Sequence, residues 1–405
     1  MVGTLVPEGG EFESGFISLA GQRFQRHALR ELAAAGVSPE LVLSMRPIAA
    51  FPKARRLWLS GGRHEAGGVT VTLLPTVNVQ PLKSLLAGAI AALRLLAWCW
   101  RRRSEPKLVL SFNLSDPPGL FTWAAARLGR ARLVGWVLDL HEPGGLVPDT
   151  LRRRLDLAMH RWLIPRLDGL VVVADRIAHD FAPGKRYLRI EAGVDAGPFS
   201  TPPPPRDGTA DCFDVVLAGS LVAFNGVELA LDAFALLPGN GWRLTVAGGG
   251  RLEPLVRERA TADPRIRYAG VLPFDELVTL YRQSDILLNL RPTIALRTQY
   301  YFPSKLLELI ASGTPVVSTC TGHVETELAG RLFLLHEETP EALAELLRRL
   351  RALDPEARLA VGRAGREHVL TEKTWRAQAV RLEGFLREVA REPAEQAGRP
   401  ASGAP

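Results

Sequence analysis

Short apolar runs alternate with amphipathic segments of helical length along most of the chain, and this alternation restricts the fold more than any other feature. In the first half the runs are 69–75, 108–113, 132–139 and 169–174, with helical patterns at 19–36, 84–103, 118–128 and 151–164. Apolar strands joined by helices are typical of parallel sheets covered on both faces. The sequence therefore predicts an α/β fold.

The alternation begins again after a Pro/Gly-rich stretch, "EAGVDAGPFSTPPPPRDG" (191–208). Strands are then predicted at 214–220, 243–249, 266–271, 286–290, 314–319 and 332–335, with helices at 227–237, 251–260, 274–283, 304–312, 340–352, 356–368 and 374–390. This restart predicts two doubly wound Rossmann-like domains with an interdomain cleft as the default ligand site. We expect the domains at 1–192 and 193–370, a last helix at 371–391, and a flexible Pro/Ala/Gly-rich tail at 392–405.

The positive charge lies in the first half of the chain. Residues 1–197 contain 26 basic and 17 acidic side chains, whereas the rest of the chain contains 24 basic and 26 acidic side chains. A basic half suits an anionic membrane, a phosphorylated ligand or nucleic acid, and it equally suits a solvated surface. No basic stripe interleaved with aromatic residues is present, so no nucleic-acid partner is expected.

The sequence has no secretory signal, and its three cysteines lie far apart. Their spacing fits neither a disulfide framework nor a zinc site, so we expect a cytoplasmic protein without a bound metal. The segment "SLLAGAIAALRLLAWCWRRR" (84–103) is apolar from Leu85 to Trp100 except for Arg94. It is short for a membrane span. It suits either a helix lying on the inner membrane face or a buried α/β helix with a basic end.

The stretch "FPSKLLELIASGTPVVST" (302–319) predicts a short helix followed by a strand. Ser304 suits the N-cap, and Lys305 and Glu308 are neighbours one turn apart. The chain has six lysines among 50 basic residues, so a lysine here is unusual. An ammonium binds phosphate well and a carboxylate accepts bonds from ribose hydroxyls, so the pair suggests a nucleotide diphosphate site. The alternative is a surface ion pair.

An ordered set of stretches resembles the C-terminal domain of the family-4-like retaining glycosyltransferases of the GT-B fold, over roughly residues 190–320. The set comprises "EAGVDAGPF", "LAGSLVAFNGVELALDAFALL", "RLTVAGGGRLEPLVRE", "IRYAGVLPFDELVTLYRQSDILLNL" and "FPSKLLELIASGTPVVST". The resemblance implies a nucleotide-sugar donor bound mainly by the second domain and an acceptor bound mainly by the first. Residues 371–389 resemble the family's last helix, which crosses back to the first domain.

The resemblance assigns donor-binding roles residue by residue. Glu308 matches the second Glu of the E-x7-E signature, whereas Tyr300 stands where the first Glu belongs. The family's basic pair in the first loop becomes Ser220 and Asn225. The lost charge must therefore be offset by Lys305, by Arg291 or Arg297, or by the backbone N–H groups near Gly219. Ser304 precedes Lys305, and Gly249 matches a turn beside the nucleotide.

Other segments match the first domain of the family less closely. "VLDLHEP" (137–143) lies where relatives carry a His/Asp segment facing the sugar, so we expect catalytic roles for His141, Asp139 and Glu142. Gly10 suits a close backbone approach to the diphosphate, or only a turn. In "GQRFQR", Gln22 and Arg23 are candidates for the acceptor side, with surface charge as the alternative.

The resemblance implies sugar transfer with retention. No D-x-D pattern is present, so we expect the transfer to need neither a metal nor a cofactor. The donor would be a nucleotide sugar, and the acceptor a glycan, a lipid-linked intermediate or a small molecule. Two alternatives remain open: a weakened sugar-nucleotide-binding scaffold, and a GT-B-type epimerase.

Overall fold

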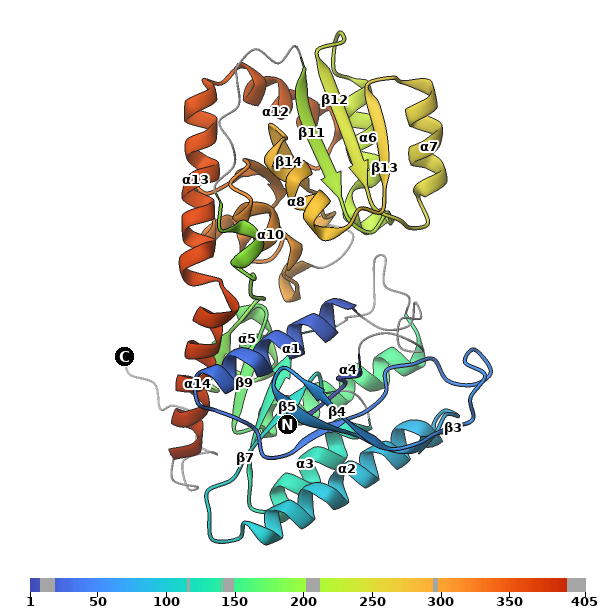
Figure 1. Ribbon diagram of the computed structural model, residues 1–405, viewed down its shortest axis with the longest axis vertical. Coiled ribbons are helices and arrows are strands. Elements are labelled where there is room, and N and C mark those ends of the chain that lie inside the picture. The colour runs from blue at the N-terminus through green and yellow to red at the C-terminus, as the bar shows by residue number, and fades with distance from the viewer. Residues whose placement is uncertain are drawn as a thin grey trace. The chain divides into compact units, whose positions relative to one another are not determined.

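A computed structural model describes residues 1–7, 19–114, 117–138, 140, 149–201, 212–293 and 298–391 (Figure 1). The described residues divide into two compact units. Unit 1 contains the described residues up to Ala192 together with the helix that begins at Trp375, and unit 2 contains Gly193–Thr374. The sequence places the last helix from residue 371, but residues 371 and 372 still belong to the preceding helix of unit 2.

Unit 1 is built on an eight-stranded sheet in the order β10-β9-β8-β7-β1-β2-β5-β4, in which only the edge strand β4 is antiparallel. The chain winds in one direction from β1 through β2 and β5, and in the other from β7 through β10, as expected of a doubly wound sheet. The strands are β1 (Val2–Gly3), β2 (Val42–Ser44), β4 (Gly62–Ala66), β5 (Val69–Leu73), β7 (Leu108–Phe112), β8 (Arg132–Val137), β9 (Gly169–Val172) and β10 (Tyr187–Arg189); β3 (Trp58–Leu59) and β6 (Thr76–Val77) form a separate antiparallel pair.

The helices of unit 1 are α1 (Leu19–Ala34), α2 (Leu82–Arg101), α3 (Pro118–Leu128), α4 (Leu151–Leu163), α5 (Asp175–Phe181) and α14 (Trp375–Arg391). Helix α2 is the one helix in the described part of the chain that is long and apolar enough to cross a membrane. It packs closely on α3, because a Cβ at Gly88 would lie 2.6 Å from the ring of Phe121.

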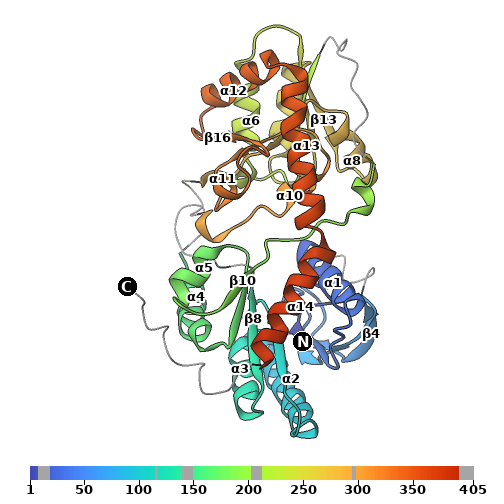
Figure 2. The ribbon, with the colours of Figure 1, turned by 90° about the vertical axis from the view of Figure 1, so that its left-hand side faces the viewer.

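Helix α14 brings the end of the chain into the core of unit 1 (Figure 2). Its first residue, Trp375, lies edge-on to Phe24 of α1, with ring centroids 4.8 Å apart. Phe24 is in turn 4.8 Å from Trp136 of β8. Edge-to-face contacts of this kind add to the burial of the rings, so the three aromatic rings join α1, α14 and the sheet.

Unit 2 is a six-stranded parallel sheet in the order β13-β12-β11-β14-β15-β16. Its strands are β11 (Phe213–Ala218), β12 (Trp242–Ala247), β13 (Ile266–Gly270), β14 (Ile286–Asn289), β15 (Val316–Thr319) and β16 (Phe333–Leu335). The winding direction reverses between β11 and β14, which are adjacent in the sheet. This is the strand order of a Rossmann-type unit.

The helices of unit 2 are α6 (Val227–Ala235), α7 (Glu253–Ala262), α8 (Phe274–Arg282), α10 (Lys305–Ala311), α11 (Val324–Glu327), α12 (Pro340–Ala352) and α13 (Pro355–Glu372). Strand residues such as Val215 and Leu244 are fully buried with Leu231 of α6 and Leu343 of α12 in one cluster. Near-continuous burial of the strands is what a sheet covered by helices requires.

The observed elements follow the predicted alternation, but the sequence did not predict the helices α5 and α11 or six short strands, β1, β2, β3, β4, β6 and β10. β1 and β2 have two and three residues, too few to show a period-two pattern. β4 has the polar sequence GRHEA and is largely exposed, as an antiparallel edge strand allows. The two doubly wound parallel sheets confirm the α/β prediction.

Two helical glycines offer a matched test of packing. A Cβ at Gly362 of α13 would overlap the carbonyl oxygen of Gly313, whereas nothing lies within 4 Å of a Cβ at Gly384 of α14. Alanine favours a helix interior over glycine by about 1 kcal/mol. We expect Gly384→Ala to raise the unfolding temperature and Gly362→Ala to lower the stability by about 1–3 kcal/mol, because backbone atoms must move. Thermal unfolding of both variants tests this, and equal stabilisation by the two would contradict the observed packing.

Candidate functional site

The carboxyl ends of β11 and β14 meet where the sheet of unit 2 reverses its winding direction. Gly219 follows β11, and Arg291 lies two residues after β14. In open α/β sheets, ligands bind outside the carboxyl ends of the strands at this reversal. Several of the predicted donor residues gather here.

The loops after β11 and β12 lie in direct contact. The N–H of Gly219 donates to Ala247 (2.8 Å), and the N–H of Leu221 donates to Gly249 (2.9 Å). Gly248 has φ +133°, and a Cβ there would overlap the carbonyl oxygen of Gly219. The predicted turn at Gly249 is thus part of a backbone platform that only glycine permits at residue 248.

The platform carries no side-chain charge at the positions where the related family has its basic pair. Ser220 is exposed, and the amide of Asn225 donates to the Ser220 carbonyl oxygen at 2.6 Å. Asn225 therefore closes the loop between β11 and α6.

Lys305 reaches from α10 to the end of β11. Its Nζ donates to the carbonyl oxygen of Ala218 at 3.1 Å. The ammonium lies so close to Gly219 that a Cβ there would overlap it. Burial lowers the pKa of Lys305 below that of an ordinary lysine, while the nearby Glu308 carboxylate raises it and Arg291 lowers it further. The cation that begins a short helix is thus directed away from that helix, toward the platform.

Arg291 supplies a second cation. Its backbone N–H donates to Oγ1 of Thr319 (2.9 Å), and its guanidinium lies 5.9 Å from the ring centroid of Phe224. Burial lowers the pKa of Arg291, and Tyr301 opposes this shift. Two partly buried cations beside each other repel, so the charges of Lys305 and Arg291 favour an anion at this edge.

The other predicted donor residues occupy α10 and the short helix before it. Glu308 is half-buried. Burial raises the pKa of the Tyr281 hydroxyl and the Glu308 charge adds to this shift, whereas at Lys305 the same charge opposes the lowering of the pKa by burial. Ser304 is exposed at the N-cap but makes no capping bond, because its backbone is already helical (φ −51°, ψ −33°). Tyr300 is buried in a 3-10 turn, Thr298–Tyr300.

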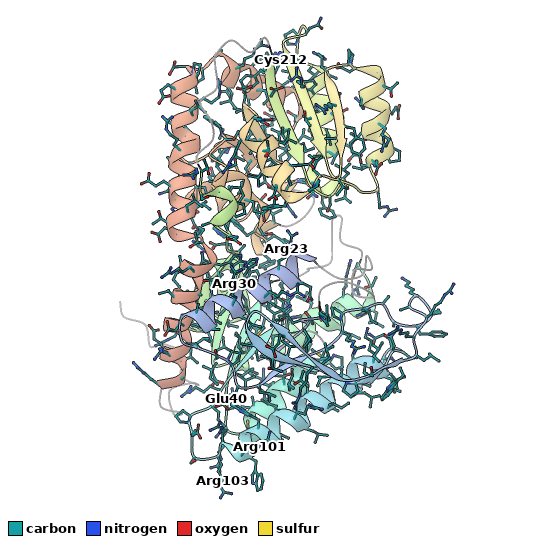
Figure 3. The ribbon with its side chains drawn as sticks, viewed as in Figure 1. Arg23, Arg30, Glu40, Arg101, Arg103 and Cys212 are labelled. Atoms are coloured by element: carbon teal, nitrogen blue, oxygen red, sulfur yellow. The ribbon has the colours of Figure 1, made fainter. Side chains whose placement is uncertain are left out.

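Unit 1 holds two of the predicted acceptor-side residues. Gln22 is buried, its amide nitrogen donates to Thr4 (2.5 Å), and its carbonyl oxygen accepts from Val6 (2.9 Å). These bonds attach α1 to the segment after β1. Arg23 is exposed beside it on α1 (Figure 3). The remaining predicted residues lie outside the described ranges; they are Gly10, Asp139, His141, Glu142 and Arg297.

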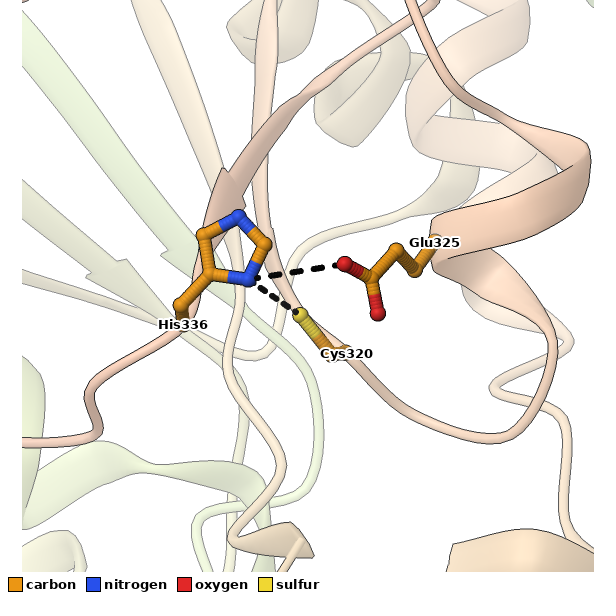
Figure 4. Close-up of side chains that lie close together, drawn as sticks. All are labelled: Cys320, Glu325 and His336. Atoms are coloured by element: carbon orange, nitrogen blue, oxygen red, sulfur yellow. Dashed lines mark hydrogen bonds and ion pairs between the residues drawn. The ribbon is translucent and has the colours of Figure 1, made fainter.

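A cluster at the ends of β15 and β16 joins Cys320, Glu325 and His336 (Figure 4). Sγ of Cys320 lies 3.4 Å from Nδ1 of His336, and that nitrogen lies 3.7 Å from Oε1 of Glu325. Burial, with the charges of Glu325 and Glu338, raises the pKa of the Cys320 thiol. A metal-binding cysteine must be a thiolate, so the geometry fits a hydrogen bond from a protonated thiol to His336.

Two groups at this edge have no recognisable signal in the sequence. Phe224 lies beneath Arg291 and Thr319 holds the Arg291 backbone, yet neither belongs to a charged or glycine-rich pattern. Gly248 had a readable signal, the "AGGG" run directly after a strand.

Comparisons with known proteins agree with this geometry. A family model described as glycosyl transferase-like matches residues 228–384. The GDP-mannose-dependent monoacylated alpha-(1-6)-phosphatidylinositol monomannoside mannosyltransferase of Corynebacterium glutamicum is 27% identical over 298 residues, which are 68% of this chain and 75% of that protein. The chain is a glycosyltransferase of the GT-B fold.

Solved structures support the fold of this glycosyltransferase. Sucrose-phosphate synthase from Thermosynechococcus elongatus superposes with a TM-score of 0.67 at 16% identity, covering 96% of this chain and 98% of the other. Anabaena HepE in complex with UDP and glucose superposes with a TM-score of 0.63 at 15% identity, covering 95% and 99%. The enzyme is similar to the family-4-like group that its sequence resembles, and it transfers sugar from a nucleotide-sugar donor.

The platform in this glycosyltransferase can be tested with two glycines of positive φ. Gly248 has no room for a Cβ, whereas nothing lies within 4 Å of a Cβ at Gly270 (φ +70°). A left-handed conformation alone costs an L residue about 1–2 kcal/mol. We expect Gly270→Ala to lower the unfolding temperature slightly and Gly248→Ala to lower it clearly more. If both variants unfold alike, the close approach of the two loops is wrong.

Proposed function

We propose that this enzyme transfers a sugar with retention, and without a metal, from a nucleoside-diphosphate sugar bound by unit 2 to a lipid-linked acceptor at the inner face of the cytoplasmic membrane. The observation that carries the proposal is the pair of cations, Lys305 and Arg291, at the reversal of the sheet. We assign the diphosphate to this pair and to the backbone platform of Gly219 and Gly249.

The donor assignment rests on charge. Ser220 and Asn225 stand where the related family has two basic side chains. We therefore assign the charge that balances the diphosphate to Lys305 and Arg291. A hydrogen bond to a charged group contributes about 1.5–3 kcal/mol. Glu308 is half-buried one turn from Lys305 and is our candidate for the ribose hydroxyls. HepE, solved with UDP, and the GDP-mannose-dependent relative support a nucleoside diphosphate donor of this class.

The proposed reaction needs no protein nucleophile. The bond between the anomeric carbon and the β-phosphate oxygen breaks, the acceptor oxygen bonds to that carbon on the same face, and the acceptor proton passes to the departing diphosphate. Charge accumulates on the diphosphate as it leaves, so cations already held in place stabilise the transition state. Positioning of the two substrates supplies the rest.

The lipid-linked acceptor rests on two observations. The mannosyltransferase relative is named for a phosphatidylinositol acceptor, and helix α2 is apolar from Leu85 to Trp100 except for Arg94. A cytoplasmic enzyme held at the membrane surface meets such an acceptor directly.

We expect Lys305→Ala to weaken binding of a nucleoside diphosphate by about 10- to 150-fold, the equivalent of one charge-assisted bond. Calorimetry against UDP, GDP, dTDP and ADP measures this effect. Arg267→Ala is the control, because it removes an exposed charge from β13 of the same unit. Unchanged affinity in Lys305→Ala would reject the phosphate role.

The lowered pKa of Lys305 predicts a dependence on pH. Because the ammonium deprotonates at a lower pH than an ordinary lysine, diphosphate affinity should decrease as pH rises from neutrality toward about pH 10. Lys305→Arg keeps its charge over this range, so its affinity should stay flat. A parallel decrease in both proteins would assign the titration to another group.

Turnover tests the reaction itself. We expect release of the nucleoside diphosphate from its sugar donor to continue in excess EDTA, since the proposed charge stabilisation comes from side chains. NMR of the product with a lipid-linked acceptor should show the anomeric configuration of the donor. Activity abolished by EDTA and restored by a divalent ion would overturn the metal-free proposal, and an inverted product would overturn retention.

A further inference from the structure

One segment of unit 1 combines half of the large exposed apolar side chains with a strong positive charge. Residues 51–103 contain nine basic side chains and one acidic side chain, Glu65, whereas the whole chain has a net charge of +7. The described residues have eighteen large exposed apolar side chains, and nine of them lie between Phe51 and Trp100. Apolar exposure and positive charge therefore coincide in one region.

Helix α2 has two apolar faces, and only one of them is packed. Small residues such as Ala87, Gly88 and Ala91 are buried on the packed face, where Gly88 meets α3 and Ala91 lies in a cluster with Leu43 and Leu74. The opposite face carries exposed side chains at helical spacing: Leu82 (48% exposed), Leu85 (40%), Leu86 (37%), Leu93 (67%) and Trp100 (71%). We call these five residues the outer face. Since the other side of α2 is fixed within unit 1, the helix can lie on a membrane but is not free to span one.

A basic and aromatic loop lies next to the beginning of α2. Loop 51–58 exposes Phe51, Leu57 and Trp58 together with Lys53 and Arg55. β3, at its end, pairs with β6, which contacts α2 (Figure 1).

The buried side chain of Asn78 fixes this loop. Its amide donates to the carbonyl oxygens of Ala49 (3.0 Å) and Arg56 (3.1 Å), and its backbone N–H donates to Leu57 (2.7 Å). The N–H of Phe51 donates back to the Asn78 carbonyl oxygen (2.7 Å). Four hydrogen bonds to one residue just before α2 thus hold the loop next to the first turn of the helix.

The far end of α2 is less suited to an anionic surface than its sequence suggests. Arg102 forms ion pairs with Glu40 (2.9 Å) and Glu105 (3.0 Å), and Trp98 donates to Glu40. Arg101 and Arg103 are exposed at the same end of α2 (Figure 3). The acidic partners reduce the net charge there, so the stronger anionic contact lies at the loop end.

We propose that the outer face and loop 51–58 form a docking surface for a bilayer that contains anionic lipid. The apolar side chains would enter the boundary between headgroups and acyl chains, and Lys53 and Arg55 would meet the lipid phosphates. Charge complementarity favours a membrane over a second copy of the chain, because two segments with eight net positive charges repel. This inference deepens the proposed function by assigning the residues that hold the enzyme beside a lipid-linked acceptor.

Sedimentation of the full-length enzyme with vesicles tests the surface. We compare vesicles of phosphatidylcholine alone with vesicles that also contain phosphatidylglycerol. The wild type should bind the anionic vesicles and release them as salt is raised. Leu86→Gln/Leu93→Gln and, separately, Lys53→Gln/Arg55→Gln should each weaken this binding by about tenfold or more.

Matched control variants replace exposed leucines or arginines that lie outside the proposed docking surface. Leu236→Gln/Leu353→Gln replaces two exposed leucines of unit 2, and Arg267→Gln/Arg376→Gln removes two exposed charges. Both should bind vesicles like the wild type. Trp58→Ala gives a second apolar test on the loop, in case the helix variant unfolds.

Three results would overturn the inference: equal binding to both kinds of vesicle, full binding by folded Leu86→Gln/Leu93→Gln, or a wild-type dimer that this variant dissociates in ultracentrifugation. Calorimetry with nucleoside diphosphates keeps the two proposals apart. A wild type that binds nucleoside diphosphates but does not bind the anionic vesicles would overturn the docking surface alone. Donor affinity absent from the wild type would instead count against the proposed function.

Discussion

The parallel pairing of β11 with β14 is the constraint on which the site of unit 2 depends. Parallel strands end at one edge, and reversal of the winding direction leaves no helix to cross directly above that edge. The backbone and side-chain groups that we assign to the donor lie at this edge. The platform of Gly219 and Gly248 follows two neighbouring strands, and Arg291 follows the third. Lys305 adds its charge from a helix by bonding to the last residue of β11.

Much of this arrangement could be read from the sequence, because buried parallel strands are apolar runs of a recognisable length. The six strands of unit 2 were predicted close to their observed positions along the chain. The proximity of Lys305 and Glu308 followed from their spacing. The sequence could not reveal the direction of the Lys305 side chain, since the contact with Ala218 joins residues 87 positions apart. The N-cap predicted for Ser304 failed to form its bond because the chain enters α10 already helical.

The first unit was harder to predict for a different reason. Its central strand β1 has two residues and owes its place to neighbours on both sides rather than to its own pattern. Gln22 was expected to face an acceptor, a role that stays a prediction, while its amide bonds to the segment after β1. A polar side chain near a predicted site has two possible partners, substrate and backbone, and sequence alone does not distinguish them. Helix α2 shows the same ambiguity, since an apolar helix may pack on both sides or on one.

The aromatic contact between Trp375 and Phe24 has a consequence for synthesis of the chain. The described residues of unit 2 all lie between Gly193 and Thr374, whereas unit 1 is completed by α14, which follows them in the sequence. During translation the strands of unit 1 are made before unit 2, and the helix that covers Phe24 is made after it. The core of unit 1 can therefore close around Phe24 only when synthesis of unit 2 is complete.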